Sequence, residues 1–209
     1  GTQSCPVNSV GVTLTVDPTP TISVQPVAQA SCDGDGASFS VTATGTSLTY
    51  QWRENGGNLS DGGVYSGTST ASLSISDVNG LNANTYDVIV TETSGSQSCP
   101  VTSSAVGLTV DPIPTITVQP LAQAECDGDA ASFTVTATGT SLTYQWQVDN
   151  GGGYSNLTDG GVYSNATTNT LTISDVNGLG GFDYRVVVSE TSGTQSCPVN
   201  SVGVTLTVD

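Results

Sequence analysis

The sequence predicts an all-β fold built of two tandem β-sandwich domains. Thr, Ser, Gly and Val dominate, and short β-branched runs alternate with polar residues between turns rich in Gly, Asn and Asp. This pattern is typical of the strands of a sandwich. The chain also repeats itself, and its 209 residues are enough for two domains that each bury a core.

The repeat predicts the domain boundaries. Residues 1–17 recur unchanged as residues 193–209 and, with small changes, as residues 95–111. The stretch that begins at Asp17 likewise matches the stretch that begins at Asp111. Such self-similarity indicates a tandem array. We therefore expect one domain over residues 18–111 and a second over 112–209. Residues 1–17 are expected to be the last strand of a truncated upstream domain, so that the natural chain continues upstream.

Alternating apolar residues in each repeat resemble the I-set immunoglobulin family. The family's motif L-x-I-x-x-V-x-x-x-D-x-G-x-Y-x-C matches the spacing of Leu73, Ile75, Val78, Asn82, Asn84, Tyr86 and Val88. It is matched again by Leu171, Ile173, Val176, Gly180, Phe182, Tyr184 and Val186. The resemblance implies two immunoglobulin-like sandwiches, with a core Trp on the third strand and a tyrosine corner.

The chain departs from the family at the cross-sheet disulfide. Val41 with Val88, and Val135 with Val186, stand where the two cysteines would be. The Trp of each core is therefore expected to pack on Val instead. The predicted core residues are Trp52, Tyr86, Val41, Val88, Trp146, Tyr184, Val135 and Val186.

Longer segments resemble one group of bacterial proteins. The combination of SFSVTATGTSLTYQW, YDVIV and a closing GLTV, with cysteines at both ends of each repeat, is similar to the immunoglobulin-like domains of giant Bacteroidota surface proteins and gliding adhesins. This resemblance implies an exported, extracellular or cell-surface protein with a structural or adhesive role.

Composition argues against several classes of function. The sequence has no His or Lys, and its two cations are Arg53 and Arg185. General acid/base and nucleophilic catalysis usually need His or Lys, so no catalytic residue is predicted and the chain is not expected to be an enzyme. A net charge of -16 repels phosphate backbones and anionic lipids, so neither nucleic acid nor direct membrane contact is expected.

Acidic residues at the predicted turns are candidates for binding Ca²⁺. Carboxylates gathered at a domain junction could hold this ion and stiffen the joint. The alternative is that these residues only stabilise turns, because Asp readily bonds to its own backbone. The candidates are Asp33, Asp35, Asp77, Asp111, Asp127 and Asp129. No other cofactor is predicted.

Five cysteines in an exported chain suggest disulfides, with two connectivities open. The first pairs Cys32 with Cys99 and Cys126 with Cys197, inside each domain. The second joins Cys32 on the A–B turn of one domain to Cys197 beside the F–G turn of the next. In the usual topology a strand length separates these turns within one domain, about 20 Å. A disulfide needs Cα atoms within about 7 Å, which favours the second. The partners of Cys5, Cys99 and Cys126 would then lie outside this sequence.

Two functions remain open. The first is a structural stalk, in which short proline linkers join rigid domains that hold a distal tip away from the cell. Its partners would be neighbouring repeats of the same chain or other copies in a filament, with a surface or glycan ligand at the tip. The second is a module whose own loops bind a glycan or a protein.

Overall fold

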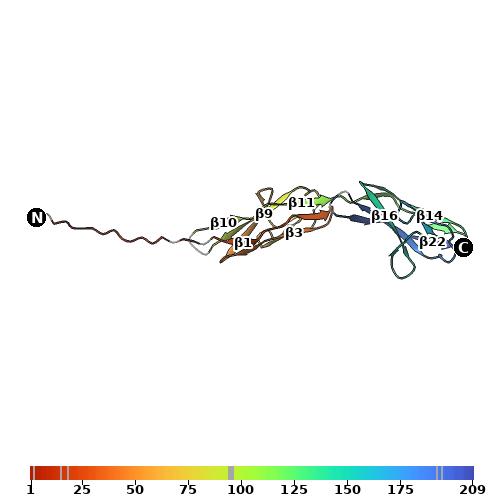
Figure 1. The fold of residues 1–209 in the computed structure, drawn as a ribbon, viewed down its shortest axis with the longest axis horizontal. Helices are drawn as coiled ribbons and strands as arrows, with labels where there is room; N and C mark the ends of the chain where they lie inside the picture. Colours follow the sequence, from red (N-terminus) through yellow and green to blue (C-terminus); the bar gives the residue numbers. More distant parts are fainter. Residues whose placement is uncertain (2, 15, 18, 94–96, 192, 194) are drawn as a thin grey trace.

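The chain forms two β-sandwiches that lie end to end along the long axis of the molecule (Figure 1). The computed structural model describes residues 1, 3–14, 16–17, 19–93, 97–191, 193 and 195–209. Every regular element in this described part is a β-strand. The prediction of an all-β fold with tandem immunoglobulin-like sandwiches is confirmed.

The first domain packs a large sheet of order β2-β11-β9-β5-β6, in which β10 also pairs with β9, against a sheet of order β3-β8-β7. A short pair, β1 with β4, completes it. Its strands are β1 (Thr21–Val24), β2 (Gln29–Cys32), β3 (Ala37–Ser40), β4 (Thr42–Thr44), β5 (Leu48–Glu54), β6 (Gly57–Asn58), β7 (Tyr65–Ser66), β8 (Ser72–Ile75), β9 (Thr85–Glu92), β10 (Cys99–Thr102) and β11 (Val106–Asp111).

The second domain repeats this topology, with sheets of order β13-β22-β20-β16-β17 and β14-β19-β18 and the pair β12 with β15. Its strands are β12 (Thr115–Val118), β13 (Gln123–Glu125), β14 (Ala131–Thr134), β15 (Thr136–Thr138), β16 (Leu142–Asp149), β17 (Ser155–Asn156), β18 (Tyr163–Ser164), β19 (Thr170–Ile173), β20 (Asp183–Glu190), β21 (Cys197–Asn200) and β22 (Val204–Val208).

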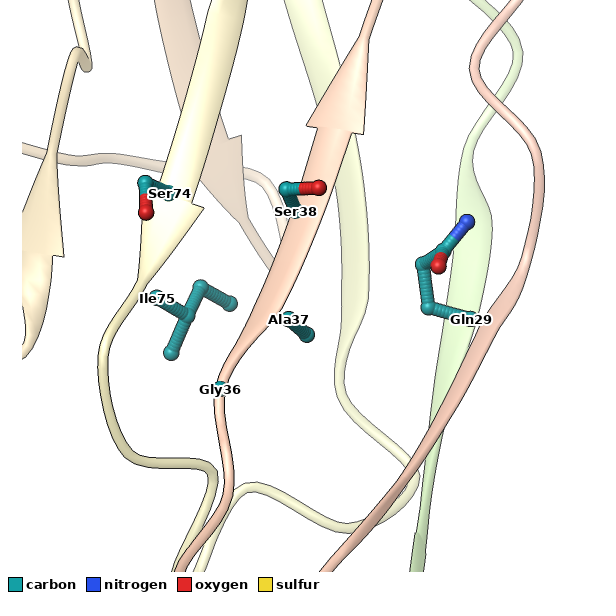
Figure 2. A pocket seen from close by; sticks show the side chains of 6 residues that line it. All are labelled: Gln29, Gly36, Ala37, Ser38, Ser74 and Ile75. Atoms are coloured by element: carbon teal, nitrogen blue, oxygen red, sulfur yellow. The ribbon is translucent and has the colours of Figure 1, made fainter. Parts of the chain in front are cut away.

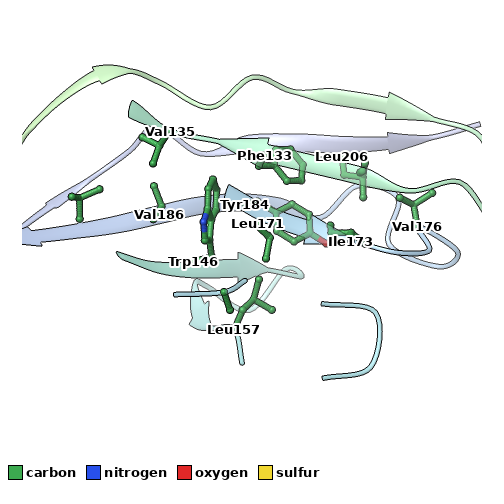
Figure 3. Close-up of a cluster of buried hydrophobic side chains, with 13 residues drawn as sticks. Phe133, Val135, Trp146, Leu157, Leu171, Ile173, Val176, Tyr184, Val186 and Leu206 are labelled. Carbon is green, nitrogen blue, oxygen red and sulfur yellow. The ribbon is translucent and has the colours of Figure 1, made fainter. Parts of the chain in front are cut away.

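Alternation along the strands places one set of side chains in each core. Along β20, every second residue is buried, beginning with Tyr184 and Val186, as expected for a strand with one face against another sheet. Figure 3 shows Val135 and Val186 pointing toward one another beside the Trp146 ring. All eight residues predicted for the two cores are buried. The Val pairs therefore fill by packing the place that a cystine has in other immunoglobulin domains.

The first strand of each domain changes sheets at a proline. In the first domain β1 pairs with β4, whereas β2 runs parallel to β11 in the other sheet. Pro26 lies between them and has no N–H to continue a ladder, while the side chain of Gln25 accepts a hydrogen bond from the Ser104 N–H (2.8 Å). Gln119 does the same for Val202 in the second domain (3.0 Å). The switch carries β2 to the end of β11, where the domain ends.

The buried tyrosines differ from the usual tyrosine corner, in which the hydroxyl bonds to the backbone. The Tyr86 hydroxyl instead donates to Glu54 Oε1 (2.8 Å), which also accepts from the Tyr65 hydroxyl (2.6 Å). In the second domain the Tyr184 and Tyr163 hydroxyls bond to each other (3.1 Å). Burial raises the pKa of both Tyr86 and Tyr184 well above the usual value.

The described residues of the segment 1–17 pair with no strand and extend away from the first domain (Figure 1). Val7, Val10 and Val12 are at least 90% exposed. The identical sequence in residues 193–209 contributes β21 and β22 to the second domain and buries Leu206. That residues 1–17 close another sandwich in the same way remains a prediction.

Replacing each buried tyrosine by Phe should lower the free energy of unfolding by a different amount, because the two hydroxyls have different hydrogen-bond partners. Tyr86→Phe removes a bond to a charged carboxylate and should lower the free energy of unfolding by about 2 kcal/mol, whereas Tyr184→Phe removes a bond between neutral groups and should cost about 1 kcal/mol. Denaturant unfolding of the full chain, followed by Trp fluorescence, measures both. A larger loss for Tyr184→Phe would contradict this account.

Stability should fall at alkaline pH. The pKa of Tyr86 is raised in the folded chain, so the native state keeps a proton that the unfolded state releases above pH about 10. The stabilisation is then fully present below that pH and decreases as the pH rises further. The denaturation midpoint, measured against pH together with tyrosinate absorbance, tests this. Tyr86→Phe should reduce the decrease and leave the part that comes from Tyr184, whose pKa is also raised. An unaltered decrease in this variant would exclude Tyr86 as a source.

Candidate functional site at the interdomain junction

The two domains are joined by a very short linker. β11 ends at Asp111 and β12 begins at Thr115, so only Pro112, Ile113 and Pro114 lie between them. Two of these three residues are prolines, whose ring fixes φ near -65° and restricts the angles between the domains. Pro114 is buried, which further limits its movement.

A disulfide between Cys32 and Cys197 crosses the junction, with the two Cα atoms 5.7 Å apart. Of the two connectivities that the sequence leaves open, this is the interdomain one. Cys32 is the last residue of β2, and Cys197 is the first of β21 in the next domain. Both are buried, with exposed fractions of 7% and 0%.

The intradomain alternative is not found. Cys99 lies opposite Glu92 at one end of β9, whereas Cys32 lies opposite Asp111, at the far end of β11. The length of the sheet therefore separates Cys32 from Cys99. Cys126 and Cys197 are separated in the same way in the second domain, because Cys197 lies opposite Glu190 and Cys126 directly follows β13. Cys5, Cys99 and Cys126 are free cysteines.

Asp111 is the polar centre of the junction and is only 3% exposed. Its carboxylate accepts a hydrogen bond from the Gln195 N–H (2.8 Å), and its carbonyl oxygen accepts one from the Asp33 N–H (2.8 Å). The side chain of Gln195 donates to the carbonyl of Ala30. The loop before β21 is thus bonded to two strands of the preceding domain.

Gly193 has a steric role at the same place. A Cβ at this position would overlap the Asp111 carboxylate, so a larger residue would displace the loop. Our sequence reasoning identified neither Gly193 nor Gln195. The signal that could have found them is the run G-x-QSC, which precedes β10 and β21 alike.

The acidic residues that were candidates for Ca²⁺ are not gathered into one group. Within the described ranges, no three acidic, Cys or His side chains are placed to hold a metal. Asp77 accepts a hydrogen bond from the Asn79 N–H (2.8 Å), as in an Asx turn. The Asp35 and Asp129 N–H groups bond to the carbonyls of Cys32 and Cys126, which closes tight turns. Asp127 accepts from the Asn177 side chain (3.4 Å), and Asp111 from Gln195. These hydrogen bonds stabilise turns and the junction between the domains.

A hollow beside β3 has no reactive lining. It encloses about 340 Å³, and Figure 2 shows Ala37 and Ser38 between Gln29 on one side and Ser74 and Ile75 on the other. Gly36, which also lines the hollow, has no side chain, and none of the other lining side chains ionises near neutral pH. The hollow therefore offers neither a general acid nor a general base.

The two arginines are used within their own domains. Arg53 forms a salt bridge with Asp87 on the neighbouring strand (2.7 Å). Arg185 donates to Gln147 Oε1 (2.7 Å) and lies over the Tyr154 ring, 3.9 Å from its centroid. Neither arginine belongs to the junction. In the portion of the chain that the structure describes, no helix has the length and apolar character to cross a membrane.

Fold and junction together define a tandem immunoglobulin-like protein. Residues 20–104 match the model of the Immunoglobulin I-set domain, so the first sandwich is similar to that family, and the second repeats its sequence and topology. Domains of this kind are typically non-catalytic structural or binding modules. No curated protein matches the chain in sequence.

The chain is similar to solved structures. One is Drosophila OTK, extracellular domains 3–5, with 20% identity and a TM-score of 0.54 over 91% of this chain and 62% of that one. An I-band fragment of titin matches with 15% identity and a TM-score of 0.49 over 92% of this chain and 66% of that one. The chain thus spans less than two thirds of the length of either structure.

Asp111→Ala should weaken the junction, and Asp209→Ala is its matched control. The first substitution leaves the Gln195 N–H without its acceptor and should cost about 1 to 2 kcal/mol. Asp209 has the same position at the end of the second domain, but its side chain is exposed. Amide hydrogen exchange should show faster exchange at Gln195 in Asp111→Ala alone. Equal exchange in both variants would show that the Asp111 carboxylate does not hold the loop.

Proposed function

We propose that this chain is a stalk segment of a large secreted cell-surface protein of the adhesin type, in which the joint between domains is locked covalently. The observation that carries the proposal is the Cys32–Cys197 disulfide across a linker of three residues. A flexible tether would need neither the disulfide nor the buried Asp111. A spacer that keeps its length and direction needs both.

Location outside the cell is supported by chemistry. Disulfides persist mainly in oxidising compartments such as the cell exterior. The extracellular domains 3–5 of Drosophila OTK have the same fold. The resemblance of the strand sequences to giant Bacteroidota surface proteins supports a bacterial surface as the place of function.

The disulfide changes how the chain carries tension. It joins residues separated by 165 positions. Tension applied at the two ends passes along β1 and β2 to Cys32, crosses to Cys197, and leaves along β21 and β22. Residues 33–196, which hold most of both cores, lie outside this covalent path. Pulling therefore cannot extend them while the disulfide is intact.

The alternative of a ligand-binding module has less support. Three tyrosines that could form an exposed binding platform, on β7, on β18 and just before β17, have partners within their own domains. Tyr65 donates to Glu54, Tyr163 bonds to Tyr184, and Tyr154 lies under Arg185. We therefore assign binding of a glycan or protein to some other part of the full protein, and the spacer role to these two domains.

Force spectroscopy on single molecules tests the stalk. The chain is held at its two ends, with Cys5, Cys99 and Cys126 changed to Ser so that only the junction disulfide remains. The oxidised chain should not release the segment between Cys32 and Cys197. The same chain with Cys32→Ser and Cys197→Ser should release it, gaining roughly 550 Å of contour length at about 3.3 to 3.6 Å per residue.

Reduction of the disulfide in the first chain is the matched control and should reproduce the longer extension. An oxidised chain that extends as far as the double variant would contradict the stalk proposal, because the disulfide would then carry no tension.

A further inference from the structure

Two free cysteines occupy the outer ends of the molecule in the positions that Cys32 and Cys197 occupy at the junction. Cys126 follows β13 as Cys32 ends β2, and Cys99 begins β10 as Cys197 begins β21. Cys126 is exposed and Cys99 is half-buried, although their bonded counterparts are buried. The difference is that a neighbouring domain covers the bonded pair.

The outer end of the first domain already has the arrangement of the junction. The Gln97 N–H donates to the Asp17 carboxylate (2.7 Å), as the Gln195 N–H donates to Asp111 (2.8 Å). Cys99 also lies opposite Glu92 in the same register as Cys197 opposite Glu190. The linker carboxylate and Gln97 are therefore hydrogen-bonded as at the junction without an upstream domain.

The outer end of the second domain has the same hydrogen bonds as the first domain's side of the junction. The Asp127 N–H donates to the Asp209 carbonyl (3.2 Å), as the Asp33 N–H donates to the Asp111 carbonyl (2.8 Å). The tight turn after the cysteine is closed by the Asp129 N–H in one domain and by the Asp35 N–H in the other, at 3.0 and 2.9 Å. Cys126 is thus presented on the same turn as Cys32.

We propose that the disulfide recurs at every junction of the array. The Cys126 thiol bonds to the Cys99-type thiol of a following repeat, and Cys99 bonds to the Cys126-type thiol of a preceding one. Each bond forms by exchange with a disulfide oxidant: two thiols lose two protons and two electrons, and the oxidant is reduced to two thiols. This inference rests on the proposed stalk function and extends it to the array.

The recurring disulfides would form overlapping loops. Cys126 lies inside the segment that the Cys32–Cys197 bond closes, so the next bond begins before the previous loop ends. Tension along such an array runs only through the first and last strands of each domain, the linkers and the disulfides. No single domain could then extend without breaking a covalent bond.

The repeat allows a seamless test. Because residues 1–17 and 193–209 are identical, the full chain can be continued after Asp209 with a second copy of residues 18–209, which recreates the natural Asp-Pro linker. This longer chain is refolded with oxidised and reduced glutathione, and its disulfides are mapped by nonreducing peptide mass spectrometry. We expect a bond between Cys126 of the first copy and Cys99 of the second, together with Cys32–Cys197 in each copy.

A matched variant, Cys126→Ser in the first copy, should leave Cys99 of the second copy as a thiol without changing the other bonds. A map in which both Cys32–Cys197 bonds form but Cys126 and the second Cys99 stay free would overturn the array proposal and leave the stalk proposal standing. A map without the Cys32–Cys197 bonds would overturn both.

Discussion

The parallel pairing of β2 with β11 is the constraint on which the junction depends. It places Cys32 directly opposite Asp111, so the turn cysteine and the last residue of the domain reach the same end of the sandwich. The pairing is possible because the chain breaks at Pro26 and crosses from one sheet to the other. Without that crossing, β2 would continue beside β3 in the other sheet, and Cys32 would not lie beside Asp111.

In other immunoglobulin domains a cystine stabilises the core, whereas in this chain the cystine joins two domains. Inside each sandwich, Trp52 or Trp146 packs on a pair of Val side chains, and the indole N–H donates to the carbonyl of Thr70 or Thr168 at 2.9 Å. The core thus holds together by burial and hydrogen bonding. The covalent bond is used between domains, where it joins residues 165 positions apart, and a disulfide that closes a long loop stabilises most.

Sequence reasoning predicted what depends on local pattern. Period-two alternation was enough to assign Trp52, Val88 and their counterparts to the cores, because a strand with one buried face leaves that trace. Contacts between segments that are distant in the sequence produce no such pattern. Glu54 accepts bonds from two tyrosines in the first domain, whereas Val148, paired with Tyr184 as Glu54 is with Tyr86, cannot. Gln195 bonds to Asp111 and Ala30 of the preceding domain, and Gly193 lies against Asp111, so the alternation of residues within their own domain does not indicate their role. The acidic turns suggested calcium because turn-forming Asp and Ca²⁺-binding Asp look alike in sequence.

The two repeats differ along their sides but agree in their buried cores and at their ends. The salt bridge of Arg53 with Asp87 becomes a hydrogen bond of Gln147 with Arg185 on the same pair of strands. By contrast, the turn cysteine, the linker Asp and the G-x-QSC loop are present in both. A domain that worked alone could vary its ends as freely as its sides. A domain that must join a copy of itself at both ends cannot, because each end has to fit the opposite end of its neighbour. The pattern of agreement is the one that head-to-tail joining of like domains requires.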